Sequence, residues 1–86
     1  MPKISEFFGI SIYIYYREHS PPHFHAFYAG SQASVSIQGL AVLAGSLPPR
    51  AMGLVVEWAS QHLDDLQRVW EQAARREPLG RIEPLR

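Results

Sequence analysis

Three of the four histidines lie in one short segment, His19-Ser20-Pro21-Pro22-His23-Phe24-His25. His23 and His25 are two positions apart, so on a strand their side chains share one face, with Cα atoms roughly 6.5–7 Å apart. Together with His19, across the rigid Pro-Pro loop, they could supply three imidazole ligands and leave a fourth position open, as in catalytic zinc sites. One alternative for this segment is therefore a site for zinc or another divalent transition metal at His19, His23 and His25.

The same histidines also allow chemistry without a metal. His23 and His25 could act as general acid and base, and Arg17 could stabilise the charge that develops on phosphorus. Tyr13 and Tyr15 could stack a base, which together gives the parts of a metal-independent ribonuclease. The alternatives are that the histidine rings only hold the Pro loop, or that the tyrosines anchor a protein interface. Whether the protein is an enzyme stays open at this point.

Residues 1–47 have the period of two that is typical of strands. From residue 10 onward, isoleucines alternate with Ser11, Tyr13 and Tyr15, which predicts one aliphatic face and one aromatic and polar face. His23, His25 and Phe27 likewise share a strand face, flanked in an antiparallel sheet by Ser34 and Ser36. The pattern predicts short strands, with turns at Gly9 and Gly30, over residues 4–7, 10–17, 23–28, 33–38 and 40–43.

Residues 48–76 change to the three- and four-residue period of an amphipathic helix. The apolar stripe includes Trp58 and Trp70, and Ser46 is a candidate N-cap. One continuous helix would be ~40 Å long, more than a domain of this size spans, so one long helix and a helical hairpin both remain open. Prolines make residues 77–86 an extended tail. The predicted fold class is α+β: a small, mainly antiparallel sheet packed against the C-terminal helical part.

Length and composition exclude several classes of protein. A chain of 86 residues forms one domain, and hydrophobic residues at 47% make it too apolar to be disordered. The absence of cysteine excludes disulfides, iron–sulfur clusters and a Cys nucleophile. The formal net charge of zero provides no general attraction for nucleic acid or anionic lipid. No apolar run could span a bilayer and no signal peptide is evident, so we expect a cytoplasmic protein that does not bind membranes.

Several segments resemble a family of small bacterial proteins known as domain of unknown function 4160. They are Met1-Pro2-Lys3-Ile4-Ser5, Pro21-Pro22-His23-Phe24-His25-Ala26, Gly45-Ser46-Leu47-Pro48, Glu57-Trp58-Ala59, Trp70-Glu71 and Ile82-Glu83-Pro84-Leu85. Family members usually have Asn where this chain has Ser20. Members are often encoded beside another small protein, in an arrangement similar to toxin–antitoxin pairs. The resemblance therefore implies a partner, and it assigns no catalytic residue.

The leading interpretation is a small cytosolic bacterial protein that binds a partner, as one component of a toxin–antitoxin-like operon. The partner would be a second copy of the chain or another small protein, with Tyr13, Tyr15, Trp58 and Trp70 as binding residues. This interpretation needs no cofactor. The alternative is an enzyme that uses the face of His23 and His25, either a ribonuclease acting on RNA or a hydrolase with a histidine-bound metal.

Overall fold

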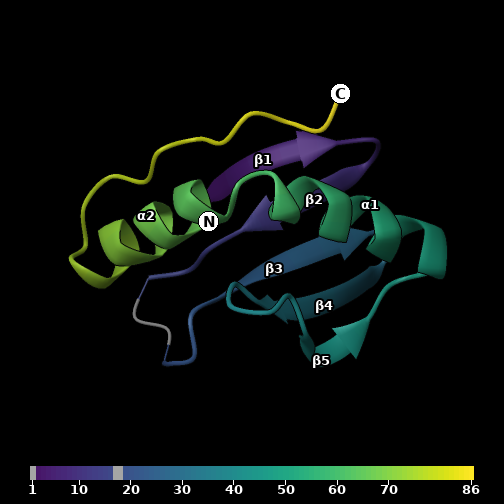
Figure 1. Cartoon of the computed structure of the whole chain (residues 1–86), viewed down its shortest axis with the longest axis horizontal. Coiled ribbons are helices and arrows are strands. Elements are labelled where there is room, and N and C mark those ends of the chain that lie inside the picture. The colour runs from purple at the N-terminus through teal and green to yellow at the C-terminus, as the bar shows by residue number, and fades with distance from the viewer. Residues whose placement is uncertain (1, 17–18) are drawn as a thin grey trace.

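The computed structural model describes residues 2–16 and 19–86. Within these residues the chain forms five strands and then two helices (Figure 1). The strands are β1 (Lys3–Phe7), β2 (Ile10–Tyr13), β3 (His23–Tyr28), β4 (Ser31–Ser36) and β5 (Val42–Ser46), and the helices are α1 (Pro49–Ser60) and α2 (Leu63–Ala74). The strands form one antiparallel sheet in the order β1-β2-β3-β4-β5, each pairing with its neighbour in sequence. The predicted α+β fold is confirmed.

Short turns explain why sequence neighbours pair. Phe7 is paired with Ile10, so Phe8 and Gly9 alone form the loop between β1 and β2, and both have positive φ, at 49° and 79°. Two positive φ angles define the mirror-image turn whose twist matches that of an antiparallel hairpin. The hairpin predicted at Gly9 is therefore confirmed, although a phenylalanine occupies the position where such turns prefer Asn, Asp or Gly.

The aliphatic face of the sheet forms the core. Ile10, Ile12 and Ile14 are fully buried, as the alternation predicts, and both helices lie on this side of the sheet (Figure 1). Trp58 of α1 is at the centre of the core, with its ring centroid 5.3 Å from that of Phe7 and 5.9 Å from that of Phe24. These contacts fix the helices on one face and leave the other face of the sheet without a helical cover.

The helical part consists of two helices and not of one long helix, which were the two alternatives that the sequence left open. The break is at Gln61 and His62, where the His62 ring packs 5.7 Å from that of Trp58 and its Nδ1 lies 3.2 Å from Oδ2 of Asp65. Hydrogen bonds from Arg68 and His62 lower the pKa of Asp65, which keeps this carboxylate charged at the N-terminal end of α2. Each helix is ~18 Å long at 1.5 Å per residue and fits within the 33 Å length of the molecule.

Several predicted boundaries are wrong. β2 ends at residue 13 and not 17, and β4 covers residues 31–36 and not 33–38. The last strand runs over residues 42–46 and not 40–43, because the preceding turn is held by Ser36, whose hydroxyl donates to the carbonyl of Gln38 and accepts from the amide of Ala41. Ser46 is consequently the end of β5 and not an N-cap. Pro48 occupies the cap position of α1, without a side-chain cap.

The C-terminal tail is extended, as predicted, but it is docked on the fold. The amide of Ile82 donates to the carbonyl of Ile4 at 2.8 Å, and the indole N–H of Trp58 donates to the carbonyl of Glu83 at 2.8 Å. Ile82 and Leu85 are buried. The tail runs beside β1 (Figure 1) and so covers that edge of the sheet, whereas β5 forms the opposite edge.

None of the helices within residues 2–16 and 19–86 has both the length and the apolar character that crossing a membrane requires.

Candidate functional site

The face of the sheet opposite the helices carries the residues that the sequence singled out. Strand alternation directs Tyr13 and His25 to this face, where they are direct cross-strand partners, and Ser34 of β4 lies opposite His25. Phe27 shares the face, two residues after His25 on β3. The side chains that alternate with them, among them Ile12, Phe24 and Ala26, point into the core. The open face is therefore aromatic and polar, as the sequence predicts.

Five rings on this face and the ring of Trp70, which reaches His23 from α2, form a continuous series of contacts, here called the aromatic row. The ring centroids are separated by 5.3 Å from Phe27 to Tyr13, 6.1 Å from Tyr13 to Tyr15, and 4.5 Å from Tyr15 to His25. The row continues over 5.1 Å from His25 to His23 and 5.3 Å from His23 to Trp70 of α2. All six residues are half-buried. Each ring is held by its neighbours while part of its surface stays accessible.

The two histidines of the row have fixed orientations. Nδ1 of His23 lies 2.7 Å from the carbonyl of Pro21, and because a carbonyl only accepts, this Nδ1 carries hydrogen and the Nε2 of a neutral ring is an acceptor. Nδ1 of His25 lies 3.2 Å from the hydroxyl of Ser34. When that hydroxyl donates, Nε2 of His25 carries the hydrogen. With these tautomers, His23 Nε2 is an acceptor and His25 Nε2 is a donor, which are the proton states of a base and an acid.

A hollow of about 240 Å³ lies beside the row. Its walls include Tyr15, His25 and Phe27 on one side and Ala44 and Gly45 of β5 on the other. The hollow exists because β2 and β3 carry large rings on this face, whereas next to them β4 and β5 carry small residues such as Ser34 and Ala44. Its volume is below the roughly 300–1,000 Å³ of typical sites for small-molecule ligands, so it fits a single side chain better than a cofactor.

The structure separates the predicted site residues into distinct groups. Tyr13, Tyr15, His23, His25 and Trp70 come together in the aromatic row. Trp58 does not join them, since it is fully buried and its N–H is bonded to the tail. Trp58 is therefore a core residue and presents no surface to a partner. Arg17 lies outside the described residues.

The predicted metal ligands are only partly brought together. His23 and His25 are adjacent, while His19 is an exposed residue of the loop before β3. Over residues 2–16 and 19–86, no three His, Asp or Glu side chains are grouped in a way that could hold a metal ion. Metal binding by His19, His23 and His25 stays a prediction, which titration of the protein with a divalent metal ion would test.

Two features of the site had no clear signal in the sequence. Trp70 belongs to the helical stripe, and nothing in its spacing connects it with His23, which is 47 positions away by residue number. The hollow depends on the register between β4 and β5, where Ser34 lies opposite Ala44 and an irregularity follows. Phe27, in contrast, could be placed on this face from its spacing to His23 and His25.

The family model for the domain of unknown function DUF4160 matches residues 9–71, which is more than half of the chain. The chain belongs to this family. The matched DUF4160 residues run from the turn after β1 to α2, so they contain the whole aromatic row, including Trp70, while the docked tail lies outside the match. No curated protein and no solved structure matches this DUF4160 chain significantly.

Proposed function

We propose that this DUF4160 protein is a small partner-binding protein and that the aromatic row docks a protein partner. The observation that carries the proposal is the row itself: five half-buried rings in successive contact on the sheet face opposite the helices, continued at the His23 end by Trp70 of α2. Aromatic side chains offer large contact area with little conformational freedom to lose, and they dominate the binding energy of protein interfaces. The adjacent hollow gives a partner side chain a place to insert.

The charge of the face favours protein over nucleic acid. Proteins that stack bases on aromatic rings combine them with basic groups for the phosphates. On the described part of this face Ser11, Gln32 and Ser34 are neutral, and the formal net charge of the chain is zero. The charged side chains of the edge strand β1 on this face, Lys3 opposite Tyr13 and Glu6 opposite Ser11, form an ion pair at 2.7 Å, so they add no net charge. A face of this kind suits the apolar centre of a protein interface, which is depleted in charge.

The family resemblance supports a more specific form of the proposal. The partner would be a second small protein encoded beside this one in the bacterial cytoplasm, as in toxin–antitoxin-like operons. A second copy of the chain is the other protein that could cover the row.

Removing two rings of the row should abolish partner binding. We expect full-length tagged Tyr13→Thr/Phe27→Thr protein to lose a partner that the wild type captures from its own organism, with affinity lowered at least ~tenfold because aromatic hot spots contribute ~2 kcal/mol or more. Threonine keeps the strand propensity of both positions. Val56→Thr, at an exposed position on the helical side, is the matched control and should capture the partner normally.

Mass spectrometry of the captured material and light scattering of the purified protein separate the possible occupants. A second small protein, or a dimer that the double variant loses, supports the proposal. Equal capture by the double variant contradicts it, and co-purifying RNA that the double variant loses would assign the row to nucleic acid.

A second candidate function is RNA cleavage without a metal, favoured by the close approach of the His23 and His25 rings, whose centroids are 5.1 Å apart. A general acid or base contributes ~10²–10⁴ in rate, so His23→Ala and His25→Ala should each reduce cleavage of single-stranded RNA by about that factor. The measurement is gel analysis of purified protein between about pH 5 and 8, the range around the ordinary imidazole pKa of ~6.5. A chelator should have no effect if the mechanism is metal-free and should abolish activity if the histidines bind metal. Intact RNA with the wild type would contradict both versions.

A further inference from the structure

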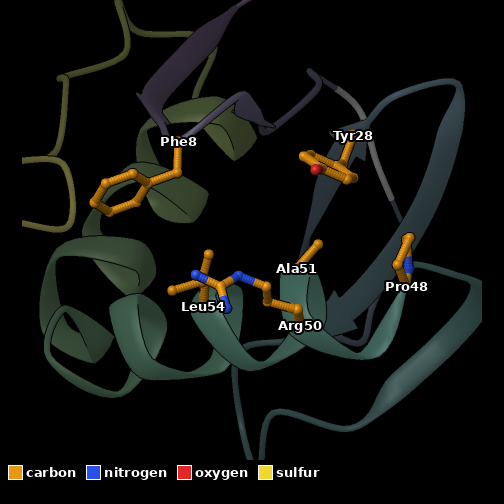
Figure 2. A pocket seen from close by; sticks show the side chains of 6 residues that line it. All are labelled: Phe8, Tyr28, Pro48, Arg50, Ala51 and Leu54. Carbon is orange, nitrogen blue, oxygen red and sulfur yellow. The ribbon is translucent and has the colours of Figure 1, made fainter.

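A second recess lies on the helical side of the sheet, away from the aromatic row. Its volume is about 210 Å³, and it is lined by Phe8, Tyr28, Pro48, Arg50, Ala51 and Leu54. Figure 2 shows these side chains, with Phe8 coming from the turn between β1 and β2, Tyr28 from the end of β3, and the others from the cap position and first turns of α1. The lining is mainly apolar, with Arg50 as its one charged member. We refer to this recess as the Phe8 pocket.

Phe8 is an unfavourable residue for the fold itself. Its side chain is 63% exposed, and its backbone is left-handed, with φ at 49°, which a bulky residue adopts only with strain. Asn, the residue that this turn type prefers, would remove both the exposed apolar ring and the strain of the left-handed backbone. Strained and exposed residues of this kind are concentrated at functional positions.

Arg50 also brings no visible benefit to the fold. Its side chain makes no ion pair or hydrogen bond within the described part of the chain. It lies in the first turn of α1, where a cation opposes the helix dipole, and no acidic residue of that turn compensates it. The pocket therefore combines an apolar interior with a positive charge that no described residue neutralises, and its complement is an apolar group beside an anion.

The spacing of the pocket residues limits the kinds of ligand that the pocket can bind. Arg50 and Leu54 are four positions apart on α1, so their Cβ atoms lie roughly 5–6 Å apart on one side of the helix, and a small ligand with an anion next to an apolar group can contact both. Neighbouring residues inside an extended peptide point to opposite faces. The terminal residue of a polypeptide, however, carries a carboxylate and a side chain on the same carbon. A pocket of about 210 Å³ holds one such side chain and is too small for a nucleotide.

We propose that the Phe8 pocket binds the C-terminal residue of a protein partner, with its apolar side chain between Phe8, Tyr28 and Leu54 and its carboxylate on the guanidinium of Arg50. This proposal goes beyond the role of the aromatic row and does not depend on it, because the two sites lie on opposite sides of the sheet. Because the test uses small probes instead of a protein partner, its failure would leave the proposal for the aromatic row unaffected.

The test is an NMR titration of the full chain with N-acetyl-leucine, which mimics a C-terminal leucine, and with its neutral counterpart N-acetyl-leucinamide. We expect both to shift the amide signals around Phe8, Tyr28 and the first turns of α1, with the carboxylate binding about two- to fivefold tighter, as exposed ion pairs typically allow. Arg50→Gln should remove this preference. Arg81→Gln, which removes an exposed arginine of the tail, should preserve it.

The variant Phe8→Asn adds a readout that a purely structural role would not give. It should abolish the shifts and at the same time raise Tm by about 2–8 °C, because the turn loses its strain. Equal affinity for the two probes, shifts outside the pocket, or no shifts at all would overturn the proposal. A lower Tm for Phe8→Asn would also overturn it, since Phe8 would then be a structural residue.

Discussion

Replacing Trp58 with alanine is expected to lower the free energy of unfolding by about 3–5 kcal/mol, the usual cost of removing a large aromatic side chain from a core. The indole is fully buried, contacts Phe7 and Phe24, and donates its N–H to Glu83, so the substitution leaves a cavity and also releases the tail. Small domains have only about 5–15 kcal/mol of stability in total. Urea unfolding followed by circular dichroism measures the loss.

Trp70→Ala is the matched control for this prediction. Trp70 is half-buried at the end of the aromatic row, so its removal should cost clearly less stability while weakening partner binding. Equal losses of stability in the two variants would contradict the assignment of Trp58 to the core and Trp70 to the binding face.

Replacing Gly45 with alanine should detach or distort β5. Gly45 has φ at 73°, and a Cβ atom there would collide with the backbone carbonyl of Gln32 on β4, which cannot move without breaking the sheet. The left-handed backbone costs about 1–2 kcal/mol for a non-glycine residue, and the steric overlap adds about 1–3 kcal/mol. Both the free energy of unfolding and the amide-exchange protection of β5 should fall.

The variant Gly30→Ala separates the cost of the left-handed backbone from the cost of the steric overlap. Gly30 has φ at 85°, but a Cβ there would meet nothing within 4 Å, so only the backbone cost applies. We expect Gly45→Ala to be the more destabilising variant by the steric cost. Equal destabilisation would show that β5 does not pack against β4 as closely as the structure indicates.

Much of the fold follows from periodicity. The alternation around Ile10, Ile12 and Ile14 predicts which face is buried, and the same alternation places Tyr13 and His25 on the open face. These predictions succeed because strand geometry couples sequence spacing directly to side-chain direction. The number of helices could not be predicted, because the apolar stripe continues through His62, although the structure has the break between α1 and α2 at that residue.

Features that depend on tertiary contacts could not be predicted. Trp58 and Trp70 occupy the same stripe, and only the packing of α1 and α2 on the sheet sends the first into the core and the second to His23. The strain at Phe8 likewise could not be predicted from the sequence, which indicates a strand over residues 4–7 and a turn at Gly9 but not a left-handed backbone at Phe8. The docking of the tail through Ile82 follows from the free edge of β1 and has no local signal.

The most direct test of partner binding by the aromatic row is a map of the contact surface. The captured partner is added to isotope-labelled full-length protein, and chemical-shift changes are measured by NMR for backbone amides and aromatic side chains. The proposed function predicts that the largest changes fall on Tyr13, Tyr15, His25 and Phe27 and on the β4 and β5 residues around the hollow, while the solvent-exposed side of α1 near Val56 stays unchanged. Changes confined to the helices, with the row unaffected, would contradict the proposal.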